Sequence, residues 1–163
     1  MKVPQIIQQK IYELRGLQHQ VRRWRLLGKT VAFTNGCFDI LHQGHIASLS
    51  DAAREADLLI VGLNSDASTR RLKGEHRPIN SQDARAILLA SLLMVDAVTI
   101  FDEDTPLELI KAIGPNVLVK GGDYSLEQIV GAKEVMAAGG RVVINPILTG
   151  FSTTGLIEKI HRL

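Results

Sequence analysis

The chain has 163 residues, of which 45% are hydrophobic and 22% charged, a composition typical of one globular domain and not of a disordered or fibrous chain. Its single cysteine, Cys37, excludes an internal disulfide framework and cannot by itself build a structural zinc site. No apolar run reaches the ~18 residues needed to cross a membrane, and the polar start lacks the apolar core of a signal peptide, so we expect a soluble cytoplasmic protein.

Most of the positive charge lies at the N-terminus. Residues 1–29 hold seven basic residues against one acid, whereas the rest of the chain holds 12 basic and 16 acidic residues. A basic segment can contact nucleic acid or an anionic surface. Apolar residues recur beside these charges at helical spacing from Ile7 to Leu27. We therefore favour a packing helix that ends at Gly28, with a homo-oligomer interface, over a nucleic-acid-binding role.

From residue 30 onward, short apolar runs alternate with helical patterns. The runs predict five strands, at residues 30–34, 58–63, 97–101, 116–120 and 141–145. Helices are predicted at residues 44–56 and 81–94, from Asp104 onward, and at residues 125–138 and 152–163. Residues 64–80 are polar and form a connection that is long for a compact domain.

Strands that alternate with helices at this spacing predict an α/β fold. We expect a Rossmann-like, doubly wound, mostly parallel five-stranded sheet over residues 30–163, preceded by an extra N-terminal helix within residues 1–29. In such sheets, ligands gather at the carboxyl ends of the strands, near the point where the strand order reverses. The polar motifs that follow the strands are therefore the candidates for function.

The segment Gly36–His45 follows the first predicted strand and leads into a helix. Its glycines let the backbone approach a ligand, and the free N–H groups of the helix N-terminus can bind an anion. His42 and His45 lie on either side of Gly44, so both can face a phosphate whose charge develops during transfer. A metal pair and a core-packed histidine are the alternatives, although the sequence holds no further ligands at metal spacing for zinc.

Three further polar motifs follow later strands. Asn64-Ser-Asp66 precedes a loop rich in cations, and Lys120-Gly-Gly-Asp-Tyr124 follows the fourth strand. Gly150-Phe-Ser-Thr-Thr154 opens the last helix, where hydroxyl groups and the helix N-terminus can hold the outer phosphates of a nucleotide. Each motif alone is also typical of a solvated loop or of an ordinary helix cap.

The pattern Phe-Asp-x-x-His-x-Gly-His at residues 38–45, together with the Ser-Thr motif, resembles the signature of the cytidylyltransferase-like nucleotidyltransferases over about residues 30–163. The interior motifs are most similar to one branch, the D-glycero-β-D-manno-heptose 1-phosphate adenylyltransferases, which make ADP-heptose for lipopolysaccharide. The related glycerol-3-phosphate cytidylyltransferases usually carry an arginine before the Ser-Thr motif, and residues 146–149 contain none. Phe151 stands where the heptose branch often has a smaller residue.

The resemblance implies transfer of AMP from ATP to D-glycero-β-D-manno-heptose 1-phosphate, by in-line attack of the acceptor's phosphate oxygen on the α-phosphorus, with release of pyrophosphate. Mg²⁺ would arrive on the ATP phosphates, and no metal ligands of the protein are predicted. A separate heptose kinase is expected as a pathway partner. The alternatives are a cytidylyltransferase acting on glycerol 3-phosphate or another small phosphorylated acceptor, and a nucleotide-binding module without catalysis.

Matching of residues to the family motifs implies three groups of roles. The catalytic group is His42, His45 and Lys73. The nucleotide-binding group is Phe33, Thr34, Asn35, Gly36, Phe38, Gly44, Lys120, Gly122, Ser152 and Thr153. The substrate-binding group is Asp39, Asn64, Asp66, Arg77, Asp123 and Tyr124.

Overall fold

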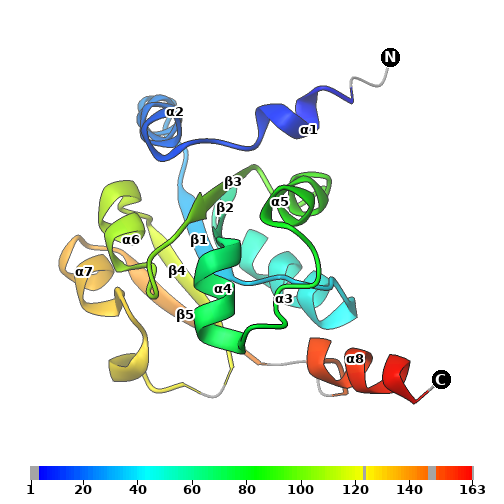
Figure 1. The fold of residues 1–163 in the computed structure, drawn as a ribbon. Coiled ribbons are helices and arrows are strands. Elements are labelled where there is room, and N and C mark those ends of the chain that lie inside the picture. Colours follow the sequence, from blue (N-terminus) through cyan, green and yellow to red (C-terminus); the bar gives the residue numbers. More distant parts are fainter. Residues whose placement is uncertain (1–3, 123, 147–149, 163) are drawn as a thin grey trace.

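The computed structural model of the protein describes residues 4–122, 124–146 and 150–162. Its centre is a five-stranded parallel sheet in the order β3-β2-β1-β4-β5 (Figure 1). The strands are β1 (Val31–Gly36), β2 (Leu58–Asn64), β3 (Ala97–Phe101), β4 (Val117–Gly121) and β5 (Arg141–Asn145). The prediction of a doubly wound α/β sheet is confirmed.

Helices precede, connect and follow the strands. They are α1 (Ile6–Gln9), α2 (Leu14–Leu26), α3 (Gln43–Ala53), α4 (Asp66–Lys73), α5 (Gln82–Ala90), α6 (Leu107–Ile113), α7 (Ala132–Ala137) and α8 (Thr153–His161), with a 3-10 turn, η1 (Leu126–Gln128). Within the described ranges, no helix has both the length and the apolar character that crossing a membrane requires.

Successive strand residues point to opposite faces of the sheet and feed two apolar layers. Val31 and Phe33 of β1 pack with buried side chains of α2, α6 and α7. Ala32, between them, packs with buried side chains of α3 and α5. Figure 1 shows these two groups of helices on either side of the sheet. A sheet covered on both faces explains why β2 is almost continuously apolar.

The N-terminal segment differs from the single predicted helix. Between α1 and α2, an extended stretch pairs with the edge strand β3: Val98 N donates to Lys10 O, and Tyr12 N donates to Val98 O, both at 2.8 Å. The open edge of β3 offers unpaired backbone groups, and pairing with them interrupts the helix. Leu17 and Val21 of α2 are buried in the chain's own core, so the homo-oligomer stays a prediction.

The polar connection predicted at residues 64–80 instead contains α4. This helix is capped by Ser65, whose Oγ accepts a hydrogen bond from Ser68 N at 3.0 Å. The next predicted helix, 81–94, ends at Ala90, and Leu93 beyond it is 96% exposed.

Two other helix predictions also need correction. α6 begins after Pro106 without a side-chain cap, whereas the expected capping residue Asp104 pairs with Arg71. The helix predicted at residues 125–138 divides into η1 and α7 at Gly131, whose φ of +87° favours glycine.

Candidate active site

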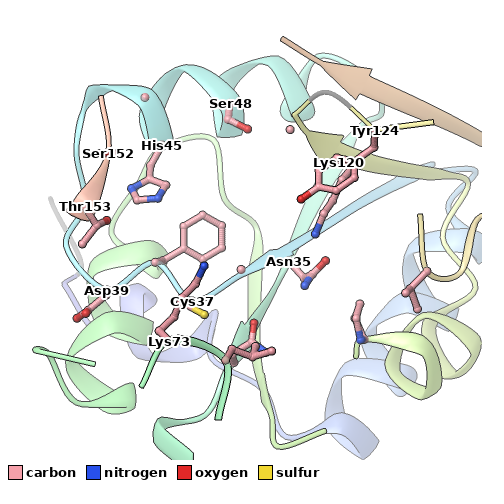
Figure 2. Close-up of a pocket in the computed structure, with 18 of the residues that line it drawn as sticks. Asn35, Cys37, Asp39, His45, Ser48, Lys73, Lys120, Tyr124, Ser152 and Thr153 are labelled. Carbon is pink, nitrogen blue, oxygen red and sulfur yellow. The ribbon is translucent and has the colours of Figure 1, made fainter. Parts of the chain in front are cut away.

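A cavity of about 760 Å³ lies at the carboxyl ends of β1 and β4. The order of strands reverses between these two, because β2 and β3 lie beyond β1 whereas β5 lies beyond β4. This is the place where doubly wound sheets bind ligands. The predicted site residues that line the cavity are Asn35, Gly36, Phe38, Asp39, His42, Gly44, His45, Asn64, Lys73, Arg77, Lys120, Tyr124, Ser152 and Thr153 (Figure 2).

Four of the predicted residues that the structure describes do not line the cavity. Phe33, Thr34, Asp66 and Gly122 are not among the described lining residues. The Phe33 ring is fully buried in the core, where a β-carbon on Gly62 would meet it at 2.8 Å. The Asp66 carboxylate accepts a hydrogen bond from Arg85 Nη2 at 2.8 Å. The side chains of Phe33 and Asp66 therefore have structural roles. Asp123 lies outside the described residues.

The two histidines lie together at the N-terminus of α3. Their rings stack with centroids 3.8 Å apart and planes at 21°, and the Phe38 and His45 rings meet edge to face with centroids 5.3 Å apart. A β-carbon on Gly44 would lie 3.1 Å from the His42 ring, and one on Gly36 would lie 3.0 Å from Phe38. A β-carbon at either glycine would therefore make these rings shift by a few tenths of an ångström.

The histidine pair is uncharged near neutral pH. Burial and repulsion from His42 lower the pKa of His45 to about 4, and burial also lowers the pKa of His42. Both Nδ1 atoms are buried and find no hydrogen-bond partner among the described residues. Buried polar atoms are rarely left unpaired, so the described protein contacts leave the hydrogen bonding of this pair incomplete.

Two lysines bring positive charge to the cavity. Lys73, from the end of α4, and Lys120, from β4, both line the cavity and are labelled in Figure 2. The Lys120 amine lies 5.9 Å from the centre of the Tyr124 ring, within range of a cation–π interaction. Burial and, secondarily, repulsion from Lys73 outweigh the opposing effect of Cys37 and lower the pKa of Lys120. An anion between the two amines would relieve that cost.

The N-terminus of α8 also reaches the cavity. Ser152 Oγ accepts a hydrogen bond from Gly155 N at 3.0 Å and so caps the helix, as predicted. Thr153 Oγ1 donates to Ile40 O, in the loop before α3, at 3.4 Å. The two helix N-termini therefore border one cavity, an arrangement suited to a polyphosphate.

Asp39, predicted to bind substrate, is occupied by protein donors. It is 2% exposed, and its carboxylate accepts hydrogen bonds from Arg77 Nε at 2.6 Å, Ile79 N at 2.7 Å and Asn80 N at 3.0 Å. Burial raises the pKa of Asp39, but these donors and the Arg77 charge outweigh it and hold the pKa below its usual value. Asp39 thus anchors the loop that carries Arg77.

Other lining residues were missed by the sequence reasoning. Ser48 of α3 lies across from Gly121, with its Oγ 3.3 Å from where a β-carbon on that glycine would stand. Residues 104–106 and 128–130 line the cavity as well. The first of these ranges follows β3, and its position after a strand could have identified it. Residues 128–130 follow no strand directly and gave no such signal.

The fold and the site together define a doubly wound α/β domain with a cavity at its switch point, and comparison assigns its family. The chain belongs to the cytidylyltransferase-like family, whose profile matches residues 33–159. The family predicted from the residue 38–45 motif is confirmed.

Several relatives are bifunctional proteins. The chain is 59% identical over 143 residues to the bifunctional protein HldE of Nitrobacter winogradskyi and 59% identical over 146 residues to that of Rhodopseudomonas palustris strain BisB5. These matches cover 88% and 90% of this chain but 29% and 30% of those proteins. The chain therefore spans less than a third of the length of these relatives.

Solved structures show the same architecture. The lipopolysaccharide core biosynthesis protein from Thermoplasma volcanium GSS1 superposes with a TM-score of 0.59 at 28% identity, covering 74% of this chain and 98% of that chain. Pantoate-beta-alanine ligase from Francisella tularensis superposes with a TM-score of 0.60, covering 94% of this chain and 78% of that chain. At 16% identity, the second likeness concerns the fold alone.

Proposed function

We propose that this chain is an adenylyltransferase that transfers AMP from ATP to D-glycero-β-D-manno-heptose 1-phosphate, giving ADP-heptose and pyrophosphate for lipopolysaccharide core synthesis. The observation that carries the proposal is the meeting of a stacked, neutral histidine pair, two lysines and a second helix N-terminus in one cavity. The names of the HldE relatives and of the Thermoplasma protein support the lipopolysaccharide assignment.

In this proposal some of the lining residues bind the nucleotide and others bind the acceptor. His42 and His45 donate to the triphosphate, and Ser152 and Thr153 hold its outer phosphates at the N-terminus of α8. Arg77 binds the acceptor's phosphate through its terminal nitrogens, because Asp39 already holds its Nε. Lys73 neutralises charge on the transferred group.

The reaction requires no strong general base. The acceptor's phosphate is already ionised, so its oxygen attacks the α-phosphorus directly, and the bond from that phosphorus to the oxygen bridging it to the β-phosphorus breaks. The electron pair leaves with pyrophosphate, so the cavity's task is to align the two phosphates and stabilise charge. Among the described residues, no three His, Cys, Asp or Glu side chains gather to hold a metal ion. Mg²⁺ would arrive with ATP, since it prefers phosphate oxygens together with one or two carboxylates.

A panel of nucleotides and acceptors tests the proposal. Pyrophosphate release is measured with ATP or CTP and with heptose 1-phosphate, glycerol 3-phosphate or glucose 1-phosphate. ATP with heptose 1-phosphate should give the highest kcat/KM. A preference for CTP with glycerol 3-phosphate would support the cytidylyltransferase alternative, and ATP binding without pyrophosphate release from any acceptor would indicate a non-catalytic module. We also propose a cytoplasmic location and a heptose kinase activity as the source of the acceptor.

A further inference from the structure

One arginine is fully buried behind the cavity. Arg85 of α5 has no exposed surface and is the largest of the fully buried side chains in the described chain. It is not among the residues that line the cavity. A guanidinium group stays charged in a protein, so complete burial requires hydrogen-bond partners for it.

Four acceptors surround this guanidinium group, and they come from three segments of the chain. Arg85 Nη1 donates to Cys37 O at 2.5 Å and to Asn64 O at 2.9 Å. Its Nε donates to Asn80 O at 3.0 Å, and its Nη2 donates to Asp66 Oδ1 at 2.8 Å. Three of these acceptors are main-chain carbonyls, so the contacts fix backbone positions.

Every acceptor belongs to a segment that carries part of the site. Cys37 lies in the loop that leads from β1 to the histidines, and Asn64 ends β2 and lines the cavity. Asn80 N helps to hold Asp39, the partner of Arg77. Asp66 is the first residue of α4, whose last residue is Lys73.

We infer that Arg85 is a positioning residue, which holds the loop after β1 and helix α4 in register so that the histidine pair and Lys73 act on the same phosphate. The inference rests on the proposed function for the identity of that phosphate. A planar guanidinium group reaches four acceptors in fixed directions, whereas a lysine ammonium group is a point charge that cannot replace it.

The test compares Arg85→Lys with a matched control, Arg141→Lys. Arg141 also binds one carboxylate and one carbonyl, Glu55 Oε2 at 2.7 Å and Glu55 O at 3.0 Å, but it lies on the surface at the start of β5. Because a displacement of about 1 Å can slow a reaction about 100-fold, Arg85→Lys should lower kcat by about that factor. The KM for ATP should change less than kcat, and Arg141→Lys should match the wild type.

Cys37 supplies a readout that does not depend on turnover, because it is the chain's single cysteine and lines the cavity. In Arg85→Lys, its alkylation by iodoacetamide should be several times faster than in the wild type, in protein that circular dichroism shows to be folded. If Arg85→Lys does not fold, Asp66→Ala, which removes one of the four acceptors, should show the same two changes on a smaller scale.

Unchanged kcat and unchanged alkylation in the folded variant would overturn the inference. So would a fall in kcat that equals the fraction of unfolded protein, since that is the signature of a purely structural role. If the wild type releases no pyrophosphate with any acceptor, the proposed function fails instead, and the alkylation rates still decide the role of Arg85.

Discussion

The N-termini of α3 and α8 border the same cavity but are built differently. At α3, the residue before the first turn is His42, whose side chain makes no capping hydrogen bond. At α8, the corresponding residue is Ser152, whose hydroxyl accepts a hydrogen bond from its own helix. The capping residue of the first helix makes no hydrogen bond to its own helix, whereas that of the second uses its hydroxyl oxygen as the acceptor that completes the helix.

The two helices also differ in how firmly they pack against the rest of the chain. Leu49 and Ala52 of α3 are buried against the sheet, whereas none of the described side chains of α8 is buried. The two meet where Phe151 approaches Gly44 and Thr153 bonds to Ile40 O. Helix α3 is therefore the more firmly packed half of the proposed triphosphate site, so substitutions there should have the larger effects.

The largest loss of activity is expected from a substitution in α3. His45→Ala removes a donor aimed at charge that develops in the transition state, and such a loss costs about 100–1,000-fold in kcat. Steady-state pyrophosphate release measures it. His19→Ala, at an exposed position of α2, is the matched control and should leave kcat unchanged. A near-normal rate in folded His45→Ala would remove this histidine from the proposed mechanism.

The low pKa of His45 should also make the free energy of unfolding depend on pH. Its pKa of about 4 in the folded chain lies below the ordinary 6.5, so between these values the unfolded chain binds a proton that the folded chain does not. The free energy of unfolding should therefore fall by about 1–3 kcal/mol as pH is lowered through this window. Urea titrations of wild type and His45→Asn measure it. Equal pH dependence in the two proteins would contradict the assignment.

A methyl group added at Gly44, where α3 meets the segment before α8, should weaken nucleotide binding. In Gly44→Ala, the new β-carbon would stand 3.1 Å from both the His42 ring and Phe151 Cβ. We expect the KM for ATP to rise about tenfold, equivalent to about 1.4 kcal/mol. Gly16→Ala is the control, because its β-carbon meets only Tyr12 at an ordinary 3.8 Å. Equal KM values for the two variants would show that the close contact is irrelevant to nucleotide binding.

The smallest effect is expected at α8. Ser152→Ala removes a helix cap, which costs about 1 kcal/mol of helix stability, and one hydroxyl of the proposed phosphate site. The KM for ATP should rise several-fold with kcat nearly unchanged. Ser81→Ala removes the equivalent cap of α5, whose hydroxyl accepts from Ala84 N at 3.3 Å, and should leave KM unaltered. A larger loss of kcat in Ser152→Ala than in His45→Ala would reverse the comparison of the two helices.

Much of the fold follows from the sequence because β-strands buried on both faces read as apolar runs. The predicted strands 97–101 and 141–145 match the structure residue for residue. Helix α4 was missed because seven of its eight residues are polar, charged or small, which leaves no apolar stripe to detect. The pairing of Lys10 and Tyr12 with β3 depends on a sheet edge that local sequence does not reveal.

The candidate site was also predicted only in part. Motifs at strand ends, such as His42 to His45 and Lys120, were found because parallel strands bring their carboxyl ends together. The partners of Asp39 and the burial of Arg85 were not found, because a charged residue in a sequence is usually an exposed one. Only tertiary contacts reveal that Asp39 and Arg85 support the loops that carry the site residues.

The most direct test of the central claim is the fate of labelled ATP with heptose 1-phosphate as acceptor. If the chain transfers AMP, label from [α-³²P]ATP will appear in the sugar nucleotide, and label from [γ-³²P]ATP will leave as pyrophosphate. Transfer of the γ-label to the sugar, or retention of the α-label in free nucleotide, would contradict nucleotidyl transfer by this site.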